Sequence, residues 1–125
     1  MMNTIETKNA PTAVGPYSQA VKANGWLFCS GQLGMDPTSG ELAGDVATQA
    51  TLALTNLKAV IEAAGTTMGA VVKTTIFLAD MADFTTVNTI YAAAFGDHRP
   101  ARACVQAAAL PKNALVEIEA IACCP

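Results

Sequence analysis

Residues 71–109 read VVKTTIFLADMADFTTVNTIYAAAFGDHRPARACVQAAA, and this stretch decides the fold. Its opening, Val71 to Leu78, is rich in β-branched side chains and predicts a buried strand. Asp80 stands where a helix N-cap belongs, and Asp83 favours the first turn of the helix that follows. A second apolar strand is expected from about Arg102 to Ala109. Because a helix connects them, the two strands should run parallel in one sheet.

The chain before this stretch predicts a β-hairpin and a long helix. Asn24-Gly25 separates the apolar runs Ser18 to Ala23 and Trp26 to Ser30, and Asn-Gly between such runs is a strong hairpin signal. Apolar residues then recur at helical spacing from Val46 to Ala64, and Gly65 follows in the place of a helix-ending glycine. We therefore expect an amphipathic helix of roughly five turns.

The helix within residues 71–109 has a predicted inner face of apolar side chains. Asn88 also lies on this face by its spacing, and a buried amide needs hydrogen-bond partners. Its partner would be either the backbone or a ligand. The helix should end at Gly96. The apolar members of the face are Phe84, Val87, Tyr91, Ala94 and Phe95.

A last strand is expected from about Leu115 to Ala122, antiparallel to both strands of residues 71–109. The order hairpin, helix, strand, helix, strand, strand predicts one sheet with both helices on one face. The chain is 52% hydrophobic and has a mean hydropathy of +0.35. The sheet face without helices should therefore be buried by another copy of the chain.

Length and charge limit the classes of function. The 125 residues are expected to form a single domain, residues 1–125. A net charge of −3, a pI of about 4.9 and the lack of a Lys/Arg cluster disfavour a nucleic-acid surface. No apolar run approaches the roughly 20 residues of a membrane span and no signal peptide is recognisable, so we expect a cytoplasmic location. The four cysteines lack metal-type spacing, and no metal site is expected.

Two strands near the C-terminus carry charged residues in apolar surroundings. Arg102 follows Pro100 at the start of its strand, and a planar guanidinium fits a carboxylate. Glu117 and Glu119 share one face of the last strand, and a carboxylate in apolar surroundings can be tuned for acid–base work. Because two carboxylates cannot easily ionise in one dry pocket, at least one should reach solvent or a cation. These residues suggest a small pocket that binds an organic acid and orients a water molecule.

Each of these residues also has a purely structural interpretation. Arg102 can cover the sheet edge while its charged end stays in water, and the two glutamates can line a solvated strand face. Cys104, on the same strand face as Arg102, is either a thiol whose pKa the arginine lowers or a small apolar filler. Gly31, expected to end the second hairpin strand, is either an ordinary turn or a point of close backbone approach to a ligand.

The strand order predicts how Arg102 and Glu117 lie relative to each other. Each residue is near the start of its own strand, so antiparallel strands would place them toward opposite ends of the sheet. An offset of about five residues corresponds to roughly 17 Å. If both residues serve one site, they come from different subunits of a closed ring with pockets between neighbours.

Five segments are spread in order over essentially the whole chain: Gly15-Pro16-Tyr17-Ser18-Gln19-Ala20, Ser30-Gly31-Gln32, Val72-Lys73-Thr74-Thr75, Pro100-Ala101-Arg102 and Glu117-Ile118-Glu119-Ala120. Together they resemble the RidA/YjgF family of reactive-intermediate (enamine/imine) deaminases. The resemblance implies an α+β, chorismate-mutase-like fold, with a mixed six-stranded sheet and two helices on one face, in a homotrimer with clefts between subunits. It also implies hydrolysis of 2-iminopropanoate and 2-iminobutanoate to pyruvate and 2-oxobutanoate plus ammonia. We expect no metal or organic cofactor, because a protonated imine is already electrophilic.

The resemblance further implies roles for individual residues. The arginine of the Pro-Ala-Arg segment, Arg102, would bind the substrate carboxylate, and the first glutamate of the Glu-Ile-Glu segment, Glu117, would position the attacking water. One departure is His98-Arg99 before Pro100, where the family often has an aromatic residue, and this would alter side-chain selectivity at the cleft mouth. The other residues expected to line the cleft are Tyr17, Ser30, Gly31, Asn88 and Cys104.

We therefore expect a 2-iminobutanoate/2-iminopropanoate deaminase, which is a hydrolase of C=N bonds. It should bind imino acids and 2-oxoacids and form a homotrimer. We expect neither a membrane nor a nucleic acid as a partner. Two alternatives stay open. One is a non-catalytic trimer that binds 2-oxoacids through Arg102. The other is an RNA-cleaving or translation-inhibiting relative, which the acidic pI counts against.

Overall fold

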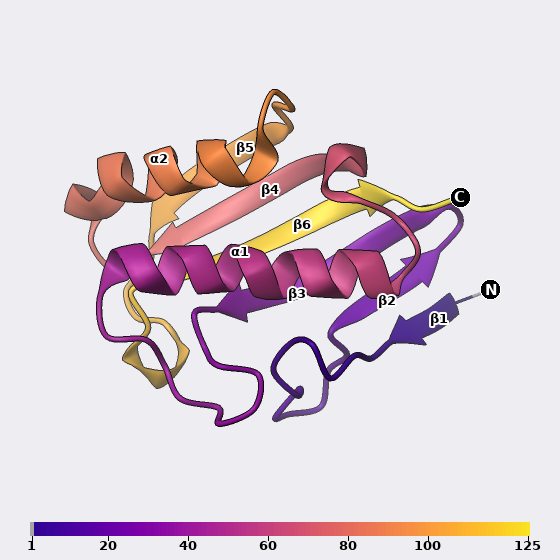
Figure 1. The fold of residues 1–125 in the computed structure, drawn as a ribbon, viewed down its shortest axis with the longest axis horizontal. Helices are drawn as coiled ribbons and strands as arrows, with labels where there is room; N and C mark the ends of the chain where they lie inside the picture. The colour runs from indigo at the N-terminus through magenta and orange to yellow at the C-terminus, as the bar shows by residue number, and fades with distance from the viewer. Residues whose placement is uncertain (1) are drawn as a thin grey trace.

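A computed structural model describes residues 2–125 as a mixed six-stranded sheet with two helices on one face (Figure 1). The strand order is β1-β2-β3-β6-β4-β5, and α2 covers the β4–β5 end of the sheet while α1 covers its middle. This confirms the α+β class and the mixed sheet. Within these residues no helix is long and apolar enough to cross a bilayer. The elements are β1 (Met2–Ile5), β2 (Ala20–Ala23), β3 (Trp26–Leu33), α1 (Val46–Ala63), β4 (Val71–Leu78), α2 (Phe84–Phe95), β5 (Ala101–Gln106) and β6 (Val116–Cys123).

The predicted hairpin and long helix are confirmed. β2 and β3 pair antiparallel across Asn24 and Gly25, whose φ angles of 52° and 81° are those that a two-residue hairpin turn requires. Asp45 caps α1 by accepting a 2.8 Å hydrogen bond from the amide of Thr48. Gly65, with φ of 92°, follows the end of α1 as expected.

The C-terminal strand lies in the middle of the sheet. β4 and β5 are parallel, as the helix between them predicts, and β6 runs antiparallel to β4. β6 is paired with β3 on one side and with β4 on the other, so β5 forms the edge. This topology puts Arg102 on an edge strand and Glu117 on a central one.

The sixth strand, β1, has no pattern in the sequence that predicts it. Its first three residues are exposed, and it is ordered by antiparallel pairing with β2 at the sheet edge. A strand that buries so little apolar surface shows no alternation of apolar and polar residues, which is the signal that a sequence prediction uses.

The start of α2 differs from the expectation. Asp80 accepts a hydrogen bond from the amide of Ala82 and caps a short 3-10 helix, Met81–Asp83, that precedes α2. The prediction that Asp80 caps α2 itself is therefore wrong. A capping side chain bonds amides two or three positions ahead, which here belong to the 3-10 turn.

The predicted inner face of α2 is right at its centre and wrong at two positions. Val87, Tyr91 and Phe95 are buried, whereas Phe84 and Ala94 are exposed. Because α2 packs over the edge of the sheet, only a narrow stripe of the helix is enclosed.

The core lies between the sheet and the helices, and the opposite sheet face is open. Three large apolar side chains on that open face, Trp26, Phe28 and Val105, are exposed. An exposed group of this kind is typical of a surface that a protein partner covers. The largest fully buried side chains include Leu27, Leu57, Ile61, Ile76 and Ile118.

Candidate functional site

Arg102 and Glu117 project from opposite faces of the sheet. Arg102 is paired with Thr74, which is fully buried beneath α2, and Glu117 is paired with Phe77. Directly paired residues share a face, and successive residues along a strand alternate faces. Thr74 and Phe77 therefore face opposite sides, so one protomer cannot bring the two charged groups together.

The predicted offset between Arg102 and Glu117 is wrong in size. Their partners on β4, Thr74 and Phe77, are three positions apart rather than five, and β4 itself separates the two strands. Three residues along the strand and two strand spacings place the two Cα atoms roughly 14 Å apart.

The Arg102 guanidinium is held against α2. Its Nη1 donates a 2.7 Å hydrogen bond to Oδ1 of Asn88, and its Cζ lies 4.9 Å from the ring centroid of Tyr91 and 5.6 Å from that of Phe84. Asn88 is exposed, so the prediction of a buried amide is wrong. Because Asn88 lies on the side of α2 that flanks β5, its side-chain oxygen is bonded to Arg102 rather than to the backbone.

Cys104 lies on the same strand face as Arg102 and packs against the core. Burial raises the pKa of the Cys104 thiol, and the Arg102 charge lowers it by a smaller amount. The interpretation that the arginine gives a reactive, low-pKa thiol is therefore wrong. Cys104 is the small, partly buried apolar residue of the other interpretation.

Glu117 lines a small cavity on the side away from Arg102. The cavity has a volume of about 140 Å³, and Tyr17, Gly31, Gln32 and Lys112 also line it. Burial raises the pKa of Glu117, and the neighbouring Glu119 raises it further. Glu119 is exposed, as the sequence argument required. Within residues 2–125 no three potential metal ligands gather.

Gly31 is the point of closest backbone approach to Glu117. A Cβ atom on Gly31 would lie 2.3 Å from Glu117 Oε2, so only glycine leaves room for this carboxylate. β3 continues through Gly31 to Leu33, and the pairing of β3 with β6 shifts register between Cys29 and Gln32. The prediction that Gly31 ends the strand is therefore wrong, because this irregularity lets the strand continue past the glycine.

Tyr17 lines the same cavity, and Ser30 bonds the segment that carries Tyr17. The Ser30 hydroxyl donates a 2.6 Å hydrogen bond to the carbonyl of Ser18, and the Ser30 amide donates to the carbonyl of Gln19. Ser30 therefore fastens the segment that carries Tyr17. The Tyr17 side chain is exposed and lines the cavity beside Gly31.

Gln19 is not among the predicted site residues, yet it organises this wall of the cavity. Its side chain is 3% exposed. Its Oε1 accepts a 2.7 Å hydrogen bond from the Thr7 amide, and its Nε2 donates a 2.8 Å bond to the Pro11 carbonyl. A buried side-chain amide bonded to several backbone groups fixes a loop in one conformation. Only the pattern of a glutamine among apolar residues could have indicated this.

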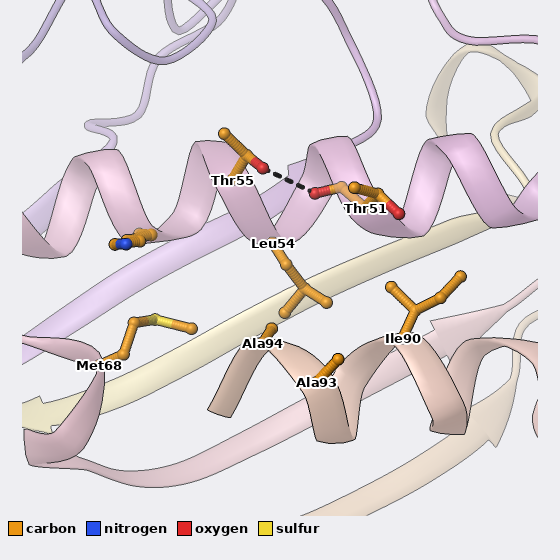
Figure 2. A pocket seen from close by; sticks show the side chains of 8 residues that line it. Thr51, Leu54, Thr55, Met68, Ile90, Ala93 and Ala94 are labelled. Carbon is orange, nitrogen blue, oxygen red and sulfur yellow. Dashed lines mark hydrogen bonds between the residues drawn. The ribbon is translucent and has the colours of Figure 1, made fainter. Parts of the chain in front are cut away.

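A larger groove lies on the outer side of the helices and holds none of the predicted residues. It has a volume of about 480 Å³ between α1 and α2, and Figure 2 shows Leu54 of α1 directed toward Ala93 and Ala94 of α2. One of its polar groups, the Thr55 hydroxyl, donates to the carbonyl of Thr51. The groove lacks the converging charged groups that imine chemistry needs.

Known proteins match this chain over nearly its whole length. A family model described as Endoribonuclease L-PSP matches residues 7–124. The 2-iminobutanoate/2-iminopropanoate deaminase of Escherichia coli K12 is 50% identical over 125 residues, with 98% of each chain covered. RidA from the Antarctic bacterium Psychrobacter sp. is 47% identical with a TM-score of 0.94, covering 97% of this chain and 98% of that one. Escherichia coli TdcF with bound serine is 46% identical with a TM-score of 0.93 and the same coverage.

Proposed function

The chain belongs to the endoribonuclease L-PSP family, which is the RidA/YjgF family that its sequence resembles, and we propose that it hydrolyses small 2-imino acids to 2-oxoacids and ammonia. The expected substrates are 2-iminobutanoate and 2-iminopropanoate, the compounds in the name of a relative 50% identical to it. The observation that carries the proposal is a partly exposed guanidinium on one sheet face and, on the other, a half-buried carboxylate that lines a cavity.

In the proposed reaction Arg102 binds the substrate carboxylate with two parallel hydrogen bonds. Glu117 accepts a proton from water as the water oxygen bonds to C2 of the protonated imine. Glu117 then returns this proton to the amino nitrogen of the carbinolamine, the C–N bond breaks to release ammonia, and the C=O bond of the 2-oxoacid forms as the hydroxyl proton passes to the Glu117 carboxylate. The raised pKa of Glu117 supports this role, because it makes the carboxylate a stronger base toward water and keeps a larger fraction of it protonated, ready to act as the acid, near neutral pH.

The remaining predicted residues complete the proposed cleft. Asn88 orients Arg102, while Gly31 leaves space for the Glu117 carboxylate. Tyr17 lines the cavity near Glu117, Ser30 fastens the segment that carries Tyr17, and Cys104 lies beside Arg102 as an apolar contact for the substrate.

We propose a homotrimer of chorismate-mutase-like subunits, with each cleft between two neighbours. Arg102 and Glu117 lie on opposite sheet faces, so a site that uses both needs two protomers. The exposed apolar side chains Trp26, Phe28 and Val105 on the open face give the assembly an interface. A cytoplasmic location is part of the proposal, because four unpaired cysteines suit a reducing compartment.

The test supplies 2-iminobutanoate from a dehydratase acting on threonine and follows release of 2-oxobutanoate. Adding the protein should speed release, and Arg102→Ala should abolish the gain. The control is Lys58→Ala, which also removes a long cation but lies in the groove between α1 and α2 that holds none of the predicted site residues. Full activity of a folded Arg102→Ala variant would overturn the mechanism.

The same preparation separates the two alternatives. A non-catalytic binder would retain 2-oxobutanoate without speeding its formation, and Glu117→Gln would leave its behaviour unchanged. The family description also names an endoribonuclease, and that function predicts RNA binding that weakens steeply with salt. With a net charge of −3 we expect no such binding.

A further inference from the structure

The Arg102 side chain lies over a ring that the fold fixes in place. Thr74 is the direct neighbour of Arg102 in the β4–β5 pair, and it is fully buried. Its hydroxyl and the Tyr91 hydroxyl share a buried hydrogen bond of 2.6 Å. The strand residue beside the arginine therefore holds the ring that the arginine contacts.

Tyr91 is also fixed from its other side. Its ring is 6% exposed and lies 4.7 Å, centroid to centroid, from the ring of Phe95. With both the hydroxyl and the ring body held, Tyr91 presents one invariant surface to Arg102. The distance of 4.9 Å from the guanidinium carbon to the ring centroid is within the range of a cation–π contact.

The arrangement leaves the guanidinium able to bind a carboxylate. Arginine has five N–H donors in a fixed plane, and the Asn88 carbonyl oxygen takes a hydrogen bond from Nη1 only. Without the ring, the long side chain would have more rotamers to lose on binding.

Core filling alone does not explain the pair of hydroxyls. A leucine or phenylalanine would fill the same space without needing a buried partner, whereas a buried tyrosine hydroxyl requires one. The tyrosine and its threonine occur together at the position that adjoins Arg102.

We propose that Tyr91, held by Thr74, is a positioning residue that fixes the Arg102 guanidinium in the orientation that binds the substrate carboxylate. This inference rests on the proposed function, because it assigns Arg102 the carboxylate. It adds Tyr91 and Thr74 to the residues on which affinity for the acid depends.

The test compares two probes, 2-oxobutanoate and its uncharged methyl ester, by calorimetric titration of the intact assembled protein. Tyr91→Leu should weaken 2-oxobutanoate binding by about tenfold, a loss typical of a partly desolvated cation–π contact, and leave the methyl ester unchanged. Tyr91→Phe keeps the ring but loses the hydrogen bond to Thr74, so it should weaken 2-oxobutanoate binding by up to about threefold, less than Tyr91→Leu does.

A second series keeps the side-chain shape and changes only the ring charge distribution. Position 91 is replaced by phenylalanine carrying successively more fluorine atoms, which removes negative charge from the ring face. Affinity for 2-oxobutanoate should fall stepwise along the series, whereas a purely structural ring would give a flat series. This series answers the question even if Tyr91→Leu does not fold.

Three outcomes distinguish a failure of the Tyr91 role from a failure of the proposed imine hydrolysis. A flat fluorine series, or equal weakening of both probes in Tyr91→Leu, overturns the role of Tyr91. If Arg102→Ala binds 2-oxobutanoate as well as the wild type does, the proposed function itself fails. If Arg102→Ala loses binding while the Tyr91 variants do not, only the inference about Tyr91 is overturned.

Discussion

Gly31 has no side chain, and the space that a side chain would take is occupied by the Glu117 carboxylate. We expect Gly31→Ala to push the carboxylate out of its cavity, because the added Cβ would lie 2.3 Å from Oε2. Stability should fall by about 1–3 kcal/mol, as for other overpacked sites, and imine hydrolysis should fall by at least about tenfold. Urea unfolding and the 2-oxobutanoate assay measure both effects.

The matched control is Gly44→Ala, since nothing lies within 4 Å of a Cβ placed on Gly44. It should change stability by no more than about 0.5 kcal/mol. Equal behaviour of the two variants would contradict the steric role of Gly31.

Glu117 should make the free energy of unfolding fall as the pH rises. Because the pKa of Glu117 is raised in the folded protein, the folded state binds more protons than the unfolded state above the ordinary glutamate pKa. Stability is therefore lost as pH rises from that ordinary value through the raised one. Glu117→Gln removes this loss, so its stability advantage over the wild type should grow across that window and then level off.

Thermal or urea unfolding from about pH 4 to about pH 8 measures this difference between Glu117→Gln and the wild type. A difference that stays constant over this range, or that shrinks as pH rises, would show that burial of Glu117 does not set its protonation.

The loop between β1 and β2 is held by one buried side-chain amide, that of Gln19. Gln19→Leu would leave the Thr7 amide and the Pro11 carbonyl without their partner. We expect a loss of about 1–3 kcal/mol in unfolding free energy and faster hydrogen exchange in residues 7–17. The control is Gln106→Leu, because Gln106 is exposed and bonds only the Met81 amide among described contacts. Unchanged exchange in residues 7–17 would show that Gln19 does not hold this loop.

Elements whose signals are local were predictable, and those that depend on partners were not. The bounds of α1 and β4 follow from caps, spacing and β-branched residues within each segment. β5 ends at Gln106 rather than Ala109 because β4, its only strand partner, ends at Leu78. β1 depends wholly on its pairing with β2.

In the candidate site, too, the residues with a local signal were predictable and the features that depend on strand pairing were not. The sequence marks Arg102 and Glu117 as candidates, because charged residues in apolar strands are conspicuous. It missed that they occupy opposite faces, since that depends on which strand separates them. The Thr74–Tyr91 hydrogen bond was also out of reach, because it joins two elements whose contact no local pattern records.

The open face of the sheet predicts that the whole molecule is an oligomer. Phe28 is 47% exposed there. Phe28→Asp would place a charge in the proposed interface, and we expect the protein to change from a trimer to a protomer of 12.8 kDa and lose activity. Sedimentation equilibrium measures the mass. Phe28→Leu, which keeps the surface apolar, should stay trimeric; a wild type that is itself monomeric would refute the assembly.

A site shared between subunits can be tested by mixing two inactive variants that each lack one of its two charged residues. Arg102→Ala and Glu117→Gln, each inactive alone, are unfolded together at equal amounts and refolded into mixed assemblies. If each cleft takes Arg102 from one protomer and Glu117 from its neighbour, about one quarter of the clefts regain both residues, and a matching share of wild-type imine hydrolysis returns. If both residues act within one protomer, no cleft is restored, and the mixture stays as inactive as its components.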